Sequence, residues 1–330
     1  MTEAKPIKPH ERLAAALSAD MEAVGTLITA RMASTSAPRI PEVTAHLVGA
    51  GGKRMRPMLT VAAARLFGYE GDDHVKLAAT VEFIHTATLL HDDVVDESSQ
   101  RRGRPTANLL WDNQSSVLVG DYLFARSFQL MVETGSLRIL DILSGAAATI
   151  AEGEVLQLTA ARNLATTEET YMRVVRGKTA ALFQAACESG AVVAGASEHD
   201  VAALSDYGDA LGISFQMIDD WLDYGGAGDG IGKDLGDDFR EGKLTLPVIR
   251  AVACADAEER AFWRAALEQG RTEDLAHART LLARHGTLES TRQEAVGWRD
   301  RAKAALHRLP RSELRDMLGD LADYVVARAL

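Results

Sequence analysis

The chain has 330 residues, of which 47% are hydrophobic and 25% charged, the mix of an ordinary globular protein. Its formal net charge of −11 argues against nucleic acid as a partner, because binding to a phosphate backbone requires a basic surface. The cysteines form no zinc or disulfide pattern, the first residues lack a signal peptide's apolar segment, and no run approaches the ~20 apolar residues of a transmembrane segment. We therefore expect a cytoplasmic protein that contacts a membrane at most transiently.

The placement of proline predicts a helical chain. Residues 106–246 contain no proline and are rich in Ala and Leu, and no stretch alternates convincingly like a strand. In chain order we expect helices at 10–33, 40–50, 54–67, 75–97, 105–112, 115–133, 137–160, 168–189, 198–224, 243–254, 258–269, 273–285, 288–308 and 312–329. Without repeats or long linkers, residues 1–330 are expected to form a single domain, with its chemistry at 51–250 and supporting helices at 251–330.

Two of these helices carry polar side chains on one stripe and end in acids. The helix at 75–97 is apolar almost all round, which indicates a position inside a bundle. Spacings of three or four residues place its polar side chains on one face: His85, Thr88, Asp92 and Asp96. The helix at 198–224 repeats this arrangement with Gly212, Gln216, Asp219 and Asp223.

Each acidic end has the sequence DDxxD, at 92–96 and at 219–223. The first and last Asp lie four residues apart on one face, where like charges repel, and the dipole of a helix C-terminus also disfavours anions. A bound cation relieves both effects, and oxygen donors without cysteine favour Mg²⁺. The alternatives are a solvated acidic helix end, which two copies disfavour, and a calcium loop, whose acids would alternate at every second position.

Basic residues close to these acids predict a phosphate ligand. GGKRMRP at 51–57 places three cations after a Gly-Gly turn, and Arg101 and Arg102 follow the first DDxxD. Three further cations follow along the chain: Lys178, Lys233 and Lys243. Lys178 is followed directly by Thr179. Taken alone, each lysine would be interpreted as an ordinary surface residue. A single His85 in an apolar helix would be interpreted as a core residue whose hydrogen bonds are satisfied. Together, acids for a metal, cations for phosphate and an apolar bundle suit a diphosphate with a hydrocarbon tail.

A series of motifs between residues 45 and 250 resembles the trans-type prenyl diphosphate synthases, most closely the long-chain octaprenyl and decaprenyl synthases that make ubiquinone side chains. They are GGKRMRPML, EFIHTATLLHDDVVDESSQRRGRPTAN, SVLVGDYLFARSF, AEGEVLQL, RGKTAALF, FQMIDDWLDYGG and GKLTLP. The resemblance implies an all-α helical bundle of the isoprenoid synthase type around a deep central cavity. It also implies a Mg²⁺-dependent prenyltransferase that is usually a homodimer.

The resemblance further implies a role for each matching side chain. Three Mg²⁺ ions are expected to bridge the aspartates to an allylic diphosphate, two of them on Asp92 and Asp96 and one on Asp219. Asp223 is also assigned to the metals, and Asp93 and Asp220 support them. The allylic diphosphate is expected to meet Arg101, Lys178, Gln216 and Lys233. Isopentenyl diphosphate is expected to meet Lys53, Arg56, His85 and Arg102, and Thr179 lines the reacting centre.

The implied reaction joins isopentenyl diphosphate repeatedly to an allylic starter, farnesyl or geranylgeranyl diphosphate. The allylic C–O bond ionises, the second double bond attacks the carbocation, and a proton is lost to the released diphosphate. Product length then depends on how far the growing tail travels below Asp92. Ala87 and Thr88 are small enough to let it pass, and Phe83, Phe128 or Met131 are expected to form the floor unless they are plain core packing.

Two other functions are weighed against this one. A terpene cyclase ionises a similar substrate, but such enzymes replace the second aspartate set and need no site for a second diphosphate. A non-catalytic subunit of a heteromeric synthase would have lost aspartates, and all six are present. The sequence leaves open whether the product has eight or ten isoprene units and which allylic starter is preferred.

Overall fold

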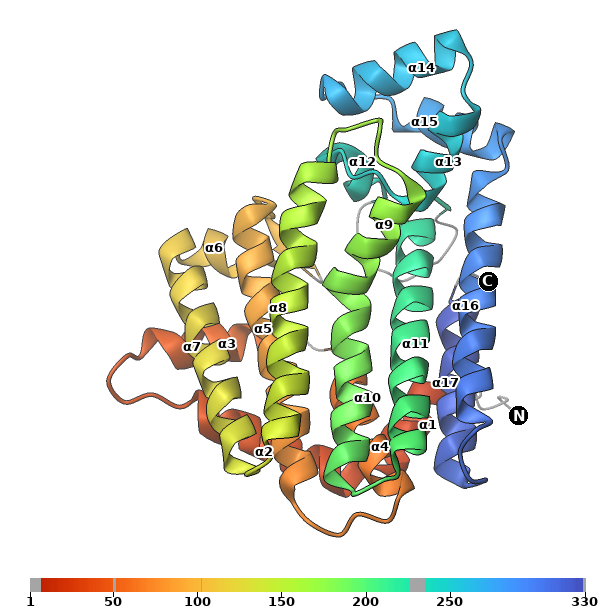
Figure 1. The fold of residues 1–330 in the computed structure, drawn as a ribbon. Helices are drawn as coiled ribbons and strands as arrows, with labels where there is room; N and C mark the ends of the chain where they lie inside the picture. The colour runs from red at the N-terminus through yellow and green to blue at the C-terminus, as the bar shows by residue number, and fades with distance from the viewer. Residues whose placement is uncertain (1–6, 50–51, 102, 226–234, 329–330) are drawn as a thin grey trace, which may run out of the picture.

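Long helices lying side by side form the body of the molecule, and shorter helices close its ends (Figure 1). The computed structural model describes residues 7–49, 52–101, 103–225 and 235–328. Its helices are α1 (Pro9–Ala16), α2 (Ser18–Met32), α3 (Arg39–Gly49), α4 (Met55–Leu66), α5 (Asp73–Val95), α6 (Ala107–Leu110), α7 (Asn113–Glu133), α8 (Leu137–Ala160), α9 (Glu168–Val175), α10 (Ala181–Val193), α11 (Glu198–Gly225), α12 (Asp237–Glu241), α13 (Leu246–Cys254), α14 (Ala257–Trp263), α15 (Leu275–Arg284), α16 (Thr287–Leu306) and α17 (Glu313–Ala327). Two π-helical turns, η1 (Arg176–Ala180) and η2 (Arg264–Glu268), continue α9 and α14, and β1 (Gln100–Arg101) pairs antiparallel with β2 (Arg104–Pro105).

The predicted all-α class is confirmed, and most predicted helices match observed ones to within a few residues. The predicted helix at 10–33 is wrong in one respect, because it bends by 82° into α1 and α2. No Gly or Pro marks the break at Leu17, but the bend lets both Leu13 and Leu17 reach the core. The helix predicted at 168–189 contains the η1 turn and continues to Val193, and the β1–β2 hairpin was not predicted.

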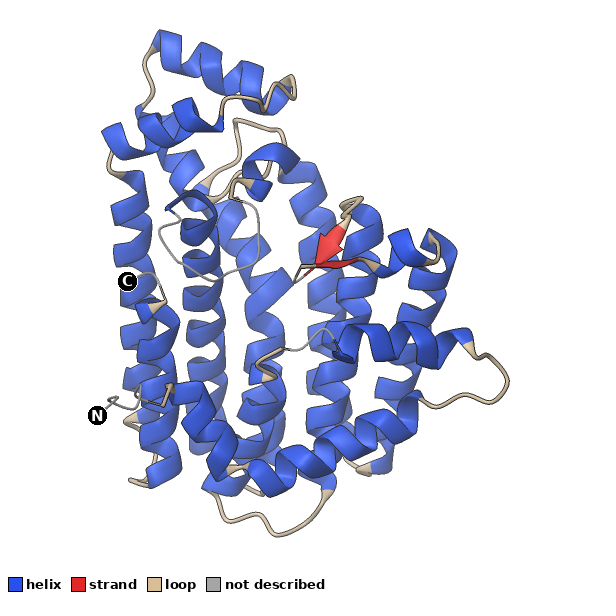
Figure 2. Ribbon diagram, turned by 180° about the vertical axis from the view of Figure 1, so that it is seen from behind, coloured by secondary structure: helices blue, strands red, loops and turns tan. Residues whose placement is uncertain are grey.

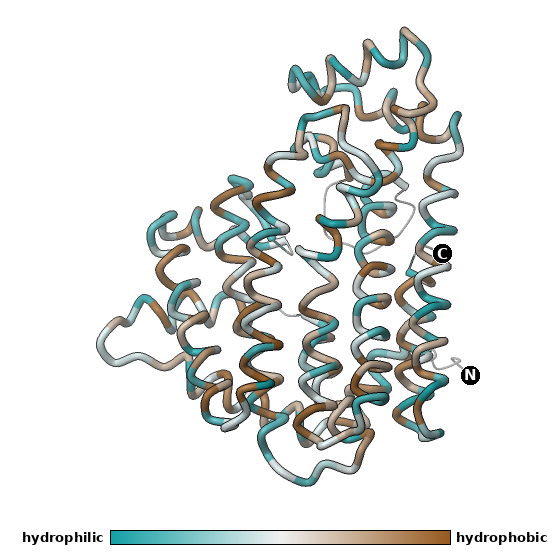
Figure 3. The backbone as a smooth tube through the Cα atoms, viewed as in Figure 1, coloured by the Kyte–Doolittle hydropathy of each residue, from teal (hydrophilic) through white to brown (hydrophobic). Residues whose placement is uncertain are grey.

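No single helix in the described part of the chain combines the length and hydropathy needed to cross a membrane, and α1 and α2 meet that test only as a bent pair. Apolar and polar positions alternate along the helices, as Figure 3 shows. This pattern is expected of helices that bury one face and expose the other.

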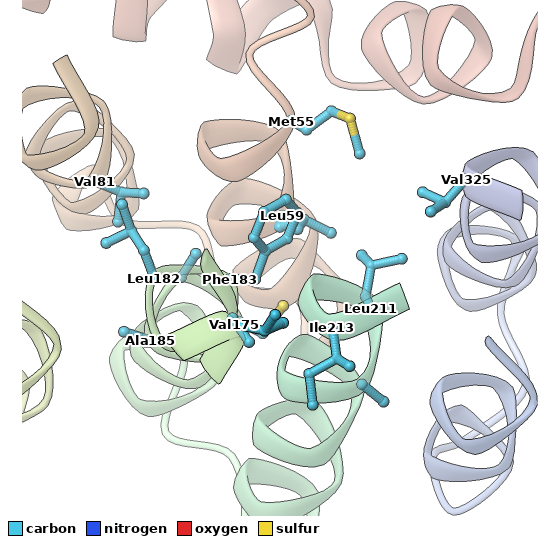
Figure 4. Close-up of a cluster of buried hydrophobic side chains, with 14 of the residues drawn as sticks. Met55, Leu59, Val81, Val175, Leu182, Phe183, Ala185, Leu211, Ile213 and Val325 are labelled. Carbon is cyan, nitrogen blue, oxygen red and sulfur yellow. The ribbon is translucent and has the colours of Figure 1, made fainter. Parts of the chain in front are cut away.

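Apolar side chains from distant parts of the chain meet in one core. Figure 4 shows Met55 and Leu59 of α4 gathered with Phe183 of α10, Leu211 of α11 and Val325 of α17. All five are buried, and full burial of such a side chain contributes roughly 1.5–3 kcal/mol. The core therefore fixes the first and last parts of the chain against α10 and α11. Helix α16 packs along α11 and α17, whereas α14 and α15 stand beyond the end of the bundle (Figure 1).

Two close helix contacts hold the η1 turn in place. A Cβ atom on Gly153 of α8 would lie 2.7 Å from the backbone nitrogen of Lys178, and one on Gly212 of α11 would lie 2.6 Å from the Cα of Ala180. No real Cβ atom approaches so closely, so glycine allows α8 and α11 to touch the turn. π-Helical turns are frequent at functional sites, and this one carries Lys178 and Thr179.

We expect Gly153→Ala to force α8 away from η1 and to lower the free energy of unfolding by about 1–3 kcal/mol. Gly297→Ala is the matched control, because Gly297 lies inside α16 with open space around it, and it should raise stability by about 0.5–1 kcal/mol. Urea unfolding followed by circular dichroism measures both. Similar effects of the two substitutions would contradict the close packing at η1.

Candidate active site

The two aspartate sets lie at the ends of α5 and α11, and the η1 turn contacts the first set directly and Gln216, one turn before the second set. Lys178 Nζ lies 3.9 Å from Asp92 Oδ2, and Thr179 Oγ1 donates to Gln216 Oε1 at 2.7 Å. The segment around α12 connects the sets a second time. Lys243 Nζ lies 3.4 Å from Asp96 Oδ2, and the backbone N–H groups of residues 237 and 238 each donate to Asp223 at 3.1 Å. The structure thus gathers the two predicted sets into one site.

Asp92 is a carboxyl group whose surroundings disfavour its charge. Burial raises its pKa to about 7, although Lys178 opposes the shift, and the charges of Glu154 and Asp96 add to it. Lys178 itself donates to Glu154 Oε2 at 2.8 Å. Acids outnumber the lysine here, so the cluster favours a further positive charge.

Each of the other acids of the first set is held by a cation. Asp93 is fully buried and accepts from Arg101 Nε at 2.8 Å, and burial raises the pKa of Asp93 although Arg101 lowers it. Asp96 faces Lys243, whose ammonium also contacts Glu241. Burial favours the neutral form of Lys243, but the charges of Asp238, Asp96 and Glu241 outweigh it and raise the Lys243 pKa. The β1–β2 hairpin that carries Arg101 is seen in red in Figure 2.

The three acids of the second set have different partners. Asp219 Oδ1 lies 3.1 Å from Arg328, whose guanidinium stacks over the ring of Phe215 at 4.4 Å. Burial, with the charge of Asp238, raises the pKa of Asp223 to about 7. The same two causes raise the pKa of Asp220 to about 8. Buried carboxyl groups with raised pKa values are typical of functional sites.

These residues fit a hard divalent cation. The donors are carboxylates, and two of their buried oxygens, Asp93 Oδ2 and Glu154 Oε1, have no hydrogen-bond partner. Within the described ranges, no three His, Cys, Asp or Glu side chains already converge on one point. A cation would stabilise the ionised forms of Asp92 and Asp223, which burial disfavours, and Mg²⁺ prefers such oxygen donors.

A pocket beside α5 contains part of the predicted site for isopentenyl diphosphate. Its lining includes Gly52, Arg54, Glu82, His85, Thr86 and Arg101. Arg56 Nη1 lies 3.3 Å from His85 Nε2, whereas Lys53 donates to the hydroxyl of Tyr324 at 3.1 Å. Arg54, in the same motif, was not singled out from the sequence, yet it lines the pocket with a left-handed backbone, φ 45°. The predicted residues Arg102 and Lys233 lie outside the described residues.

The residues predicted to set product length fall into two groups. Phe83, Ala87 and Met131 are fully buried, and Thr88 is partly buried, with its hydroxyl donating to the His85 carbonyl at 2.8 Å. Their role in chain length stays a prediction. Phe128 is 43% exposed. The prediction that Phe128 forms the cavity floor is wrong for the single chain, because this side chain lies on the outer surface of α7.

Sequence reasoning gave no role to several residues that the structure places here. They are Glu154, Tyr171, Tyr324 and Arg328, while Lys243 was noticed only as a possible surface cation. Glu154 lies within the motif AEGEVLQL, which was a usable signal. Arg328 and Tyr324 come from a helix that was expected only to support the bundle, and nothing nearby in the sequence marks them.

The chain is similar to known proteins over most of its length. The sequence model of the polyprenyl synthetase family matches residues 37–283. A crystal structure of a decaprenyl diphosphate synthase from Rhodobacter capsulatus is 69% identical, covers 97% of this chain and 99% of its own, and superposes with a TM-score of 0.94. A polyprenyl synthase from Caulobacter crescentus, solved with calcium and isoprenyl diphosphate, is 50% identical over 99% of this chain and 100% of its own, with a TM-score of 0.93. The octaprenyl diphosphate synthase of Escherichia coli is 47% identical over 94% of this chain and 96% of its own.

The chain belongs to the polyprenyl synthetase family. It is a trans-prenyltransferase of the long-chain branch, and the predicted fold, enzyme class and branch are confirmed.

We expect Asp92→Asn to stabilise the metal-free protein. An acid whose pKa rises on folding, here from 3.8 to about 7, destabilises the fold as pH rises through that interval. With a chelator present, the substitution should raise the thermal midpoint by about 2–4 °C at pH 8, with a smaller gain at pH 5. The control is Asp300→Asn, at a side chain that is 62% exposed, and it should change the thermal midpoint at neither pH. A lower midpoint for Asp92→Asn at pH 8 would refute the unfavourable charge.

Proposed function

We propose that the protein extends an allylic diphosphate by repeated condensation with isopentenyl diphosphate until the all-trans product has ten isoprene units. One observation carries the proposal: cations from separate segments of the chain hold the aspartates at the ends of two apolar helices. The 69% identity to a decaprenyl diphosphate synthase supports ten units rather than eight. A product of this kind would serve as a ubiquinone side chain.

Asp92, Asp96, Asp219 and Asp223 would hold three Mg²⁺ ions. Bound Mg²⁺ would stabilise the negative charge that develops on the departing diphosphate. Support comes from the buried carboxyl groups described above and from the Caulobacter crescentus relative, which was solved with calcium and isoprenyl diphosphate.

The cations that pair with these acids are also suited to bind substrate. Lys178 and Arg101 contact carboxylates, and the same donors match the oxygens of an allylic diphosphate in charge and geometry. Gln216 and Lys233 are proposed to complete this diphosphate site. A second set is proposed for isopentenyl diphosphate: Lys53, Arg56, His85 and Arg102. The pocket beside α5, which His85 lines, and the contact between Arg56 and His85 support the assignment of these two residues.

The reaction then requires positioning and charge stabilisation more than acid–base chemistry. Lys178 and Arg101 stabilise the leaving diphosphate, which takes both electrons of the C–O bond. The buried Thr179 presents its oxygen to the allylic cation. The double bond of isopentenyl diphosphate supplies the electrons of the new C–C bond. The released diphosphate accepts the proton lost in the final step, so no protein base is needed.

The purified chain should therefore convert farnesyl and isopentenyl diphosphates with Mg²⁺ into a product of ten isoprene units, measured by chromatography after dephosphorylation. Asp219→Asn should slow turnover by about 100-fold or more, and a chelator should abolish it until Mg²⁺ is restored. Asp300→Asn serves as the control and should keep the wild-type rate.

Other products of this incubation would identify other functions. A cyclic hydrocarbon would indicate a terpene cyclase, and no turnover by the chain alone would indicate a subunit that needs a partner. A linear product of eight units would correct the length and leave the reaction in place.

We also propose that the protein is a homodimer joined through the outer face of α7 and α8. Large apolar side chains are 39–82% exposed on these adjoining helices: Val117, Leu118, Phe128, Val132, Leu137, Val155 and Leu158. A shallow groove lined by Ala151, Val155 and Leu156 runs along α8. Large exposed apolar side chains on neighbouring helices are typical of protein interfaces, and a two-fold axis would bury those of both copies at once.

We expect Val155→Glu to shift the protein from dimer to monomer, because two buried carboxylates would face each other near the axis. Size-exclusion chromatography with light scattering measures the mass. Ile7→Glu replaces an apolar side chain that is 72% exposed elsewhere and should leave the dimer intact. A dimer that survives Val155→Glu would move the interface away from α8.

The domain and location stay predictions. One continuous core that includes Leu13 and Val326 supports a single domain. We propose that the enzyme works in the cytoplasm and contacts a membrane transiently, because a product with a long hydrocarbon tail partitions into lipid.

A further inference from the structure

A chain of hydrogen bonds connects a buried tyrosine to the reacting centre. Tyr171 Oη donates to Asp220 Oδ2 at 2.6 Å, and Gln216 Nε2 donates to Asp220 Oδ1 at 2.7 Å. Gln216 Oε1 in turn accepts from Thr179 Oγ1 at 2.7 Å. The chain joins α9, α11 and the η1 turn, and Tyr171, Asp220 and Thr179 are each at most 5% exposed.

Chemistry decides the direction of this chain. A carboxylate only accepts hydrogen bonds, so Gln216 must turn its NH₂ group toward Asp220 and its carbonyl oxygen toward Thr179. A proton on Asp220 Oδ2 would be shared with Tyr171 and would still leave Oδ1 to accept from Gln216. The single hydroxyl proton of Thr179 is then held by Gln216, and the lone pairs of Thr179 Oγ1 are left for the reacting carbon.

Asp220 differs in this respect from its neighbours in the second acid set. Asp219 is 33% exposed and contacts Arg328, whereas Asp220 is 4% exposed and uses both oxygens inside the bundle. Adjacent residues of a helix point about 100° apart, so the two side chains leave α11 in different directions. The acid set is divided between two tasks.

We propose that Tyr171 and Asp220 are positioning residues, which fix the Gln216 amide so that Thr179 presents an oxygen lone pair to the allylic cation. This inference rests on the proposed prenyl transfer and names two residues that act through Gln216 and Thr179. Electron density held at a fixed place beside a developing cation stabilises it without reorganisation. A Gln216 amide free to rotate would present its NH₂ group to Thr179 in part of the population.

Tyr171→Phe tests the proposal with little change of shape. We expect kcat to fall about tenfold, while KM for both substrates and the half-saturating Mg²⁺ concentration change less than about twofold. Tyr207→Phe is the matched control, because this buried tyrosine on α11 donates instead to the Leu318 carbonyl at 2.9 Å. Its kcat should stay within about twofold of wild type. A kcat for Tyr171→Phe at the wild-type level would overturn the proposal.

A double substitution separates positioning from a general structural effect. Thr179→Val removes the hydroxyl through which the hydrogen bonds from Tyr171 act. In that background, adding Tyr171→Phe should therefore lower kcat by less than about twofold. A second tenfold loss would show that Tyr171 does not act through Thr179. Wild-type turnover in the same assay tests the proposed reaction separately.

If Tyr171→Phe does not fold, Asp220→Asn provides a second test. Asn can donate to the Gln216 carbonyl and turn the amide around, so kcat should fall about tenfold with unchanged half-saturating Mg²⁺. Mg²⁺ binding by calorimetry gives a readout apart from activity and should also be unchanged. A Mg²⁺ affinity weakened by about fivefold or more would place Asp220 among the metal ligands and overturn its assignment.

Discussion

Burial of carboxyl groups beside other acids, at the ends of α5 and α11, is the constraint on which this structure depends. Burial raises the pKa of Asp92 and Asp223 to about 7, so the fold keeps these groups where their charge is unfavourable. Such a site persists only where the rest of the protein supplies enough stability to tolerate it. The core that joins α4, α10, α11 and α17 provides that support.

The cations around these acids come from separate segments of the chain. Arg101 follows α5 in the hairpin, Lys178 lies in η1, Lys243 precedes α13 and Arg328 follows α17. Each holds a carboxylate, and each carries the kind of charge that a diphosphate requires. Under the proposed function, these cations keep the site folded without ligand, and they bind the diphosphate once Mg²⁺ neutralises the acids.

The η1 turn shows how backbone packing controls this chemistry. Glycine at 153 and 212 lets α8 and α11 approach the turn closely, and from it Lys178 reaches Asp92 while Thr179 reaches Gln216 on α11. The turn is π-helical, a geometry that is frequent at functional sites.

The sequence by itself determined the helices and the two acid stripes. Local periodicity, the proline-free region and the DDxxD spacing are properties of single segments, so α5 and α11 and their acids were predicted closely. Only the tertiary structure decided which partners meet them. Glu154 on Lys178, Arg328 on Asp219 and Tyr171 on Asp220 join residues far apart in the chain, and no periodic pattern encodes such pairs. The exposure of Phe128 on the outside of α7 was decided in the same way, because the side of a helix that faces solvent depends on its neighbours in space.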